Sequence, residues 1–186
     1  MPYKEIEKKC KEKMDKVVET ARQELRGIRT GRASAAILEG IRADYYGSQT
    51  PLNQLANINI PQPRLIEIKV WDQNAVSAVE KAIIAANIGL TPSTEGNIIR
   101  LQIPTLTSER RQQLVKRISD IVENFRVEIR NIRRDANKVI QQLAKDGKIS
   151  EDQEYRSLEN IQKITDTHIE NIDKIAAAKE KEIKEG

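Results

Sequence analysis

Residues 107–147, TSERRQQLVKRISDIVENFRVEIRNIRRDANKVIQQLAKDG, decide the fold, because their apolar side chains recur at steps of three and four. A spacing near 3.5 residues is typical of a helix that packs lengthwise against other helices. Thr107 or Ser108 can cap its start, and Asp146-Gly147 supplies a stop. The stretch predicts a helix of about 38 residues with these buried positions: Leu114, Ile118, Ile121, Phe125, Ile129, Ile132, Ala136, Val139 and Leu143.

Two further amphipathic stretches flank this helix. Residues 1–30 predict a helix that ends near Arg29, with a buried stripe at Ile6, Cys10, Met14, Val17, Val18, Ala21, Leu25 and Ile28. Residues 150–153, SEDQ, form a capping box, and the helix that follows should bury Leu158, Ile161, Thr165, His168, Ile172 and Ile175. The short turn at 146–149 forces the last two helices antiparallel. Since none of the three can hide its stripe alone, we expect a long antiparallel three-helix bundle.

The middle of the chain has a different pattern. Five of the six prolines and five of the eight glycines fall within residues 31–104, so this segment cannot be a long helix. Its short β-branched segments, 41–46, 58–60, 65–70 and 98–103, predict strands, and 75–86 predicts a helix. We expect Trp71, Tyr45 and Tyr46 to anchor the core here, and favour this over rings exposed for a partner.

The predicted fold class is therefore α+β with two domains. The bundle comprises residues 1–30 and 105–186, and a small α/β, β-rich domain at 31–104 is inserted between its first and second helices. The chain crosses the junction twice, at 29–32 and 103–106. We expect a hinge there, at Thr30, Gly31, Pro104 and Thr105, since inter-domain motion is the default when an interface is small.

Composition narrows the function classes. The chain has 186 residues with one His and one Cys, so it has few of the side chains that zinc sites, Cys–His dyads and Ser–His–Asp triads require. No nucleotide-binding or hydrolase motif occurs, so we expect no enzyme, no metal and no cofactor. His168 and Cys10 are interpreted as packed core residues. No apolar run is long enough to span a membrane, and the charged N-terminus does not resemble a signal peptide, so we expect a cytoplasmic protein.

Positive charge is concentrated in two segments. Residues 1–30 hold nine bases and six acids, and residues 105–147 hold ten and six, whereas the last 39 residues are acidic. Arg126, Arg130 and Arg133 follow an i, i+4, i+7 spacing beside the apolar stripe, with Arg134 adjacent, and Arg22, Arg26 and Arg29 repeat that spacing. Like charges so placed destabilise a helix unless a polyanion neutralises them. Arginine also grips phosphate bidentately, which favours RNA recognised by shape.

Two other interpretations of this basic face stay open. It could be a solvated surface whose arginines pair with carboxylates of the acid-rich last helix. It could also bind an acidic protein surface, which would make the chain a structural adaptor.

The sequence resembles the bacterial ribosome recycling factor family over essentially its whole length. The resemblance rests on IRTGRAS at 28–34, YYG at 45–47, TPL at 50–52, QLA at 54–56, Leu106-Thr107 with ERR at 109–111, RNIRRDAN at 130–137 and ISED at 149–152. Ser108 stands where the family usually has a second carboxylate.

The resemblance implies an L-shaped molecule that mimics transfer RNA. It implies that the chain, as a monomer, binds the large subunit of the post-termination ribosome through its bundle, and with elongation factor G and GTP splits the subunits and releases the messenger RNA. By position, the residues that match the family's RNA-contacting arginines are Arg29, Arg32, Arg110, Arg130, Arg133 and Arg134, and the charge pattern adds Arg126.

Overall fold

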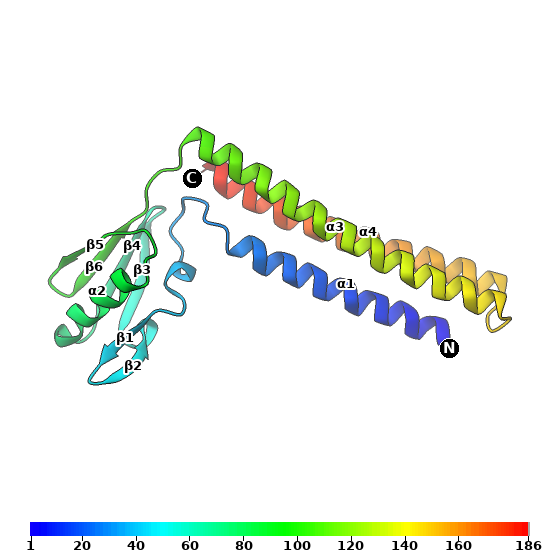
Figure 1. The fold of residues 1–186 in the computed structure, drawn as a ribbon, viewed down its shortest axis with the longest axis horizontal. Coiled ribbons are helices and arrows are strands. Elements are labelled where there is room, and N and C mark those ends of the chain that lie inside the picture. The colour runs from blue at the N-terminus through cyan, green and yellow to red at the C-terminus, as the bar shows by residue number, and fades with distance from the viewer. Residues whose placement is uncertain (186) are drawn as a thin grey trace. The chain divides into compact units, whose positions relative to one another are not determined.

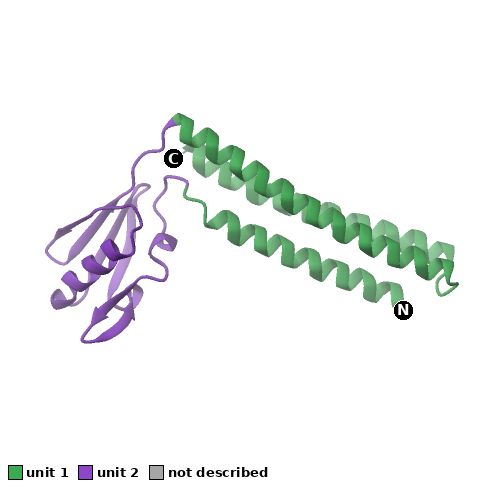
Figure 2. Ribbon diagram, in the orientation of Figure 1, with its two compact units in different colours: residues 1–29, 108–185 green, residues 30–107, 186 purple. Residues whose placement is uncertain are grey.

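The computed structural model describes residues 1–185, which form two compact units (Figures 1 and 2). Residues 1–29 and 108–185 make a helical unit, and residues 30–107 make a smaller unit that contains all the strands. The predicted α+β class, with long helices and a small sheet between the first helix and the later ones, is confirmed. Among the described residues, no helix is both long and apolar enough to cross a membrane.

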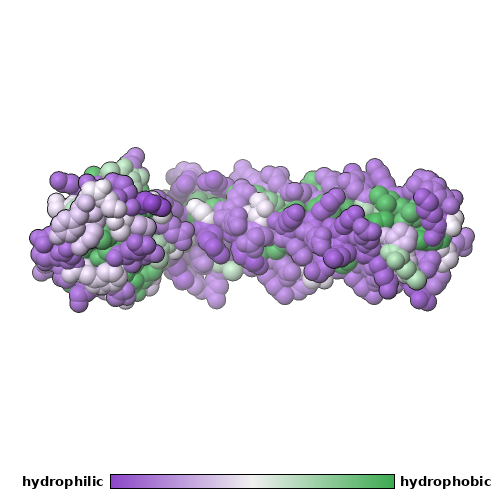
Figure 3. Space-filling model, turned by 90° about the horizontal axis from the view of Figure 1, so that it is seen from below, coloured by the Kyte–Doolittle hydropathy of each residue, from purple (hydrophilic) through white to green (hydrophobic). Residues whose placement is uncertain are grey.

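The helical unit consists of α1 (Pro2–Arg26), α3 (Ser108–Lys145) and α4 (Glu151–Glu185), and each helix packs against the other two. Its core is mainly apolar, with Met14, Ile118, Ile129 and Ile172 among the residues that have no exposed surface. On the face drawn in Figure 3, hydrophilic side chains cover most of these helices, and apolar atoms show only in separate small patches.

The buried face of α3 differs from the predicted stripe at its edges. Val122 and Ile140 are fully buried in place of Ile121 and Val139, and Val139 is 47% exposed. After Ile118 and after Ala136 the buried line takes a step of four residues where the prediction took a step of three, and this turns Val122 and Ile140 toward the core. Leu114, Ile118, Phe125, Ile129 and Ala136 are buried as expected.

The first helix ends earlier than predicted. It stops at Arg26, and the N–H of Gly27 donates to Gln23 O, whereas we expected it to continue to about Arg29. Glycine costs about 1 kcal/mol relative to alanine inside a helix, so Gly27 favours this end. Arg29 therefore lies in the segment after α1, and the helical spacing predicted for Arg22, Arg26 and Arg29 does not extend to Arg29.

The turn between α3 and α4 is held by both of its predicted caps. Gly147 adopts a φ of +68°, and the N–H groups of Gly147 and Lys148 donate to Ala144 O and Leu143 O, which satisfies the end of α3. At the start of α4 the Gln153 N–H donates to Ser150 Oγ, and the Ser150 N–H donates to Gln153 Oε1 at 2.9 Å. This double cap fixes the antiparallel pairing of the two longest helices.

The smaller unit is built on a four-stranded antiparallel sheet. Its strand order is β3 (Ala56–Gln62), β4 (Leu65–Val70), β6 (Ile98–Gln102) and β5 (Pro92–Glu95), and α2 (Val76–Ala85) packs against it. A separate hairpin pairs β1 (Arg42–Tyr45) with β2 (Ser48–Pro51). The sequence prediction missed β2 and β5, which are polar and contain proline. Their two-residue loops, Tyr46-Gly47 and Gly96-Asn97, carried the available signal.

Two of the three aromatic residues expected in this core are on its surface, so that prediction was wrong. Tyr46 is 78% exposed and Trp71 is 63% exposed, while Tyr45 packs against the core and donates its hydroxyl to Asp72 Oδ2 at 2.8 Å. Tyr46 lies in the hairpin loop with a φ of 50°, and Trp71 directly follows the last residue of β4. The core is instead filled by aliphatic side chains, among them Ile66, Ile68, Ile83, Ile99 and Leu101.

A histidine joins α1 to α4 inside the helical unit. His168 is 5% exposed, its Nδ1 lies 2.6 Å from Ile164 O, and its Nε2 lies 2.6 Å from Asp15 Oδ1. A carbonyl and a carboxylate only accept, so both contacts form when the ring is protonated on both nitrogens. The hydrogen bond from His168 lowers the pKa of Asp15, and Lys11 acts in the same direction.

Replacing Asp15 with asparagine should lower the free energy of unfolding by about 1 kcal/mol near neutral pH, because a charge-assisted bond is lost at a half-exposed site. The folded pKa of Asp15 lies below its unfolded value of about 4. The contribution of Asp15 to the free energy of unfolding is therefore present above its unfolded pKa, and it is lost as the pH falls through the folded pKa. Urea unfolding of the parent and D15N between pH 3 and 7 should show a difference in unfolding free energy that disappears at low pH.

D120N is the matched control, because Asp120 is an exposed helix carboxylate with no ion pair or hydrogen bond within residues 1–185. It should unfold like the parent throughout. A gap between the parent and D15N that stays constant down to pH 3 would contradict the proposed ion pair.

Candidate nucleic-acid interface

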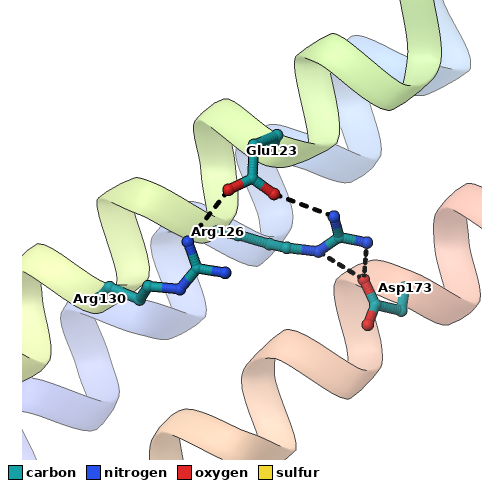
Figure 4. Close-up of polar contacts among 4 residues, drawn as sticks. All are labelled: Glu123, Arg126, Arg130 and Asp173. Carbon is teal, nitrogen blue, oxygen red and sulfur yellow. Dashed lines mark hydrogen bonds and ion pairs between the residues drawn. The ribbon is translucent and has the colours of Figure 1, made fainter. Parts of the chain in front are cut away.

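Two arginines of α3 share one carboxylate at the seam with α4 (Figure 4). Arg130 Nη1 donates to Glu123 Oε1 at 3.0 Å, and Arg126 Nη1 donates to Glu123 Oε2 at 3.1 Å. Arg126 also donates twice to Asp173 Oδ1, from Nε at 2.9 Å and from Nη2 at 2.5 Å. Two guanidinium groups and two carboxylates thus form a neutral quartet, and Arg126 is its bridge between the helices.

The titration of the quartet follows from these contacts. Hydrogen bonds from Arg130 and Arg126 hold the pKa of Glu123 below its usual range. The hydrogen bond to Asp173 raises the pKa of Arg126, with Glu123 adding to the shift. Both shifts favour the charged forms of Glu123 and Arg126, and the two carboxylates of the quartet lie against the guanidinium groups of Arg126 and Arg130.

The next two arginines along α3 lack a carboxylate partner in residues 1–185. Arg133 Nη1 donates to the amide oxygen of Gln162 at 3.1 Å, and Gln162 Nε2 donates to Asp166 Oδ1 at 2.8 Å. Arg134 is exposed and makes no hydrogen bond or ion pair in this part of the chain. Positive charge is therefore available at Arg133 and Arg134, on the side of the quartet nearer the turn to α4.

The structure brings two more of the expected residues together at the other end of α3. Arg29, after the end of α1, and Arg110, in the first turn of α3, line one groove of the helical unit. Arg110 Nη1 also donates to Gln113 Oε1 at 3.2 Å. Arg32 belongs to the smaller unit, where it is half-buried and lines a cleft with Ile60 and Pro63.

The interpretation that carboxylates of the protein neutralise the basic face therefore describes part of the stripe. Of the arginines in the stripe, Arg126 pairs with the last helix, through Asp173, whereas Arg130 and Arg22 pair with Glu123 and Glu19 of their own helices. The interpretation does not fit Arg133 or Arg134. The sequence predicts an acidic last helix antiparallel to α3, so it indicates that a carboxylate of that helix can pair with α3, but it does not give the register that selects Asp173.

The sequence pattern does not single out Arg117, nor does it indicate that the rings of Tyr46 and Trp71 are exposed. Arg117 lines the groove with Arg29 and Arg110. Its position one residue before the buried Ile118 carried the available signal. Tyr46 lies in a hairpin loop and Trp71 follows the end of a strand, and at both places periodicity gives no direction to a side chain.

Comparison with known proteins gives one family. The family model described as ribosome recycling factor matches residues 21–183. A ribosome-recycling factor of Desulfosudis oleivorans is 52% identical over 183 residues, which cover 98% of this chain and 97% of that protein. The factor of Pseudothermotoga lettingae is 51% identical over 178 residues, which cover 96% of each chain.

Solved structures agree with this result. A solution structure of a ribosome recycling factor matches with a TM-score of 0.79 and 45% identity, covering 100% of this chain and 99% of the other. The T. thermophilus ribosome recycling factor, from models of that factor and the E. coli elongation factor G bound to the E. coli post-termination complex, matches with a TM-score of 0.66 and 44% identity. That match covers 98% of this chain and 99% of the other.

Proposed function

Because the chain belongs to the ribosome recycling factor family, we propose that it recycles ribosomes at the end of protein synthesis. It binds the post-termination ribosome and, with elongation factor G and GTP, splits the subunits and frees the messenger RNA. The observation that carries the proposal is the similarity over the whole chain to a factor placed with elongation factor G on a post-termination complex.

The chain acts in this proposal as a binding protein in the cytoplasm, as a monomer, and not as an enzyme. Its sequence has no phosphate-binding loop of the GxxxxGK[ST] type, so hydrolysis of GTP is assigned to elongation factor G. The chain contributes a rigid helical surface for ribosomal RNA and a small unit on which a partner can act.

The arginines proposed to contact ribosomal RNA differ in whether a carboxylate of the protein already neutralises them. Arg133 and Arg134 have no carboxylate partner among the described residues and are proposed to grip phosphates directly. Arg130, Arg29, Arg110 and Arg32 are proposed as further contacts. Arg126 has two carboxylate partners, so we propose that it supports the surface by fixing α4 and Glu123 in place.

We also propose that the two crossings between the bundle and the inserted domain form a hinge at Thr30, Gly31, Pro104 and Thr105. Hydrogen bonds tie the crossings to one turn of the sheet: the Ala33 N–H donates to Pro63 O, the Ile103 N–H donates to Arg64 O, and Arg64 bonds Thr105 Oγ1. Gly31 lies between these anchors and the bundle, with a φ of +78°. On the first crossing, bending is thereby confined to the residues before Ala33, which include Thr30 and Gly31.

The recycling function is tested by breakdown of polysomes with this protein, elongation factor G and GTP, omitting each in turn. Monosomes and free subunits should accumulate only when all three are present. If polysomes persist with the complete set, the proposed function is wrong.

The RNA contacts are tested by comparing Arg133→Ala with Arg126→Ala. R133A should weaken binding to isolated large subunits roughly three- to tenfold and make the salt slope shallower by about one. Its unfolding midpoint should match the parent. R126A should instead lose about 1 kcal/mol of unfolding free energy, because a partly buried guanidinium leaves two carboxylates. An adaptor for an acidic protein predicts unchanged binding of R133A to large subunits.

The hinge is tested by Gly31→Ala against Gly40→Ala. Both glycines have a φ near +79°, so both variants carry similar backbone strain of about 1–2 kcal/mol. A Cβ at residue 31 would lie 3.0 Å from Leu106 Cγ, whereas one at residue 40 meets nothing within 4 Å. G31A should slow subunit splitting several-fold with little loss of subunit binding, and G40A should not. If both variants split the ribosomal subunits at the same rate, Gly31 is not part of the hinge.

A further inference from the structure

A groove in the helical unit combines positive charge with an apolar floor. Its volume is about 370 Å³, and it lies where the end of α1 meets the first turns of α3. The lining residues are Glu24, Gly27, Ile28, Arg29, Arg110, Leu114, Arg117 and Ile121. All of them belong to one compact unit, so the groove is built by the bundle alone.

The lining supplies contacts for two different parts of a nucleotide. The guanidinium groups of Arg29, Arg110 and Arg117 can hold a phosphate, and their planar faces can also stack on a base. The apolar floor, formed by Ile28 (7% exposed), Leu114 (4% exposed) and the partly buried Ile121, is suited to the flat face of a base.

Arg117 and Glu24 are the groups in the groove that the fold itself does not use. Both are exposed, and neither makes a hydrogen bond or ion pair within residues 1–185, although they line the same groove. A lone carboxylate among three arginines disfavours a bare anion as the ligand. It can accept a hydrogen bond from a ribose 2′-hydroxyl, a donor that RNA has and DNA lacks.

We propose that this groove binds a single unpaired ribonucleotide of RNA. Arg117, with Arg29 and Arg110, holds the phosphate, the base lies on Ile28, Leu114 and Ile121, and Glu24 accepts from the ribose. The volume lies near the lower end of the range of about 300–1,000 Å³ for small-molecule sites, which suits one nucleotide and excludes a paired helix. The proposal rests on the proposed function for the source of the RNA, which is then ribosomal.

Gly27 allows the groove to be filled without changing its charge. It lines the groove and has a φ of −70°, which any residue adopts, and a Cβ there would approach only Glu24 O at 3.5 Å and Gln23 O at 3.9 Å. Gly27→Leu therefore adds bulk in the groove and keeps all three arginines. Arg117→Ala removes one charge from the groove, and Lys116→Ala removes one charge from the adjacent exposed residue, which does not line it.

The experiment measures binding of the full chain to a short single-stranded oligoribonucleotide and to an RNA duplex of equal length. G27L and R117A should weaken binding of the single strand about five- to tenfold, while K116A changes it less than about twofold. Binding of the duplex should be unaffected by G27L. Methyl NMR signals of Ile28 and Ile121 should shift with the single strand in the parent, and thermal unfolding confirms that each variant is folded.

Several outcomes would overturn the proposal. If G27L binds the single strand as the parent does, or if K116A and R117A weaken it equally, the groove is only part of a diffuse basic surface. Equal affinity of the parent for ribose and deoxyribose strands of one sequence would contradict the contact of Glu24. Polysome breakdown by the parent is scored separately, so the groove can fail while the recycling function stands.

Discussion

The apolar stripe of α3 has to be covered along its whole length, and the rest of the helical unit follows from that requirement. A helix of 38 residues is about 57 Å long. One neighbour cannot enclose its buried side, so both α1 and α4 are needed, and each packs on α3 and on the other. The capped turn at Gly147 and Ser150 sets the register of α4, which in turn places Asp173 opposite Arg126 and Gln162 opposite Arg133.

This register divides the positive charge of α3 into separate places. The quartet around Glu123 is neutral, whereas Arg133 and Arg134 on one side of it and Arg117 on the other have no carboxylate partner within residues 1–185. Arg110 and Arg134 are 24 positions apart, or about 36 Å along a rigid helix. The proposed RNA contacts on α3 are thus held at a fixed separation by one helix.

Much of the bundle could be predicted from the sequence because helix periodicity and caps are local signals. The capping box at Ser150, the stop at Gly147 and burial of His168 each required only neighbouring residues. The edges of the α3 stripe were less accurate, because Ile121 and Val122 are both apolar neighbours at the border of the stripe and the sequence pattern does not decide which of them faces the core. In the small unit, polar strands such as Ser48–Pro51 are recruited by hairpin pairing and carry no hydrophobic pattern.

The sequence predicts which arginines belong to the candidate site, but it does not predict which carboxylate or amide each of them contacts. The arginine-rich segment is visible in the sequence, yet which guanidinium meets Glu123, Asp173 or Gln162 depends on the relative rotation of α3 and α4. The groove required the early end of α1 at Arg26, which turns the following residues toward the first turns of α3. Exposure of Trp71 was likewise set by the end of β4.

The insertion of the small unit between α1 and α3 imposes an order on synthesis. About 80 residues separate the end of α1 from the start of α3, and at roughly 5–20 residues per second they take about 4–16 s to emerge. Throughout that time the apolar side of α1, including Met14 and Leu25, has no partner helix to cover it. The nascent chain therefore carries an amphipathic helix whose apolar side is exposed to chaperones, while the sheet that follows it is already able to fold.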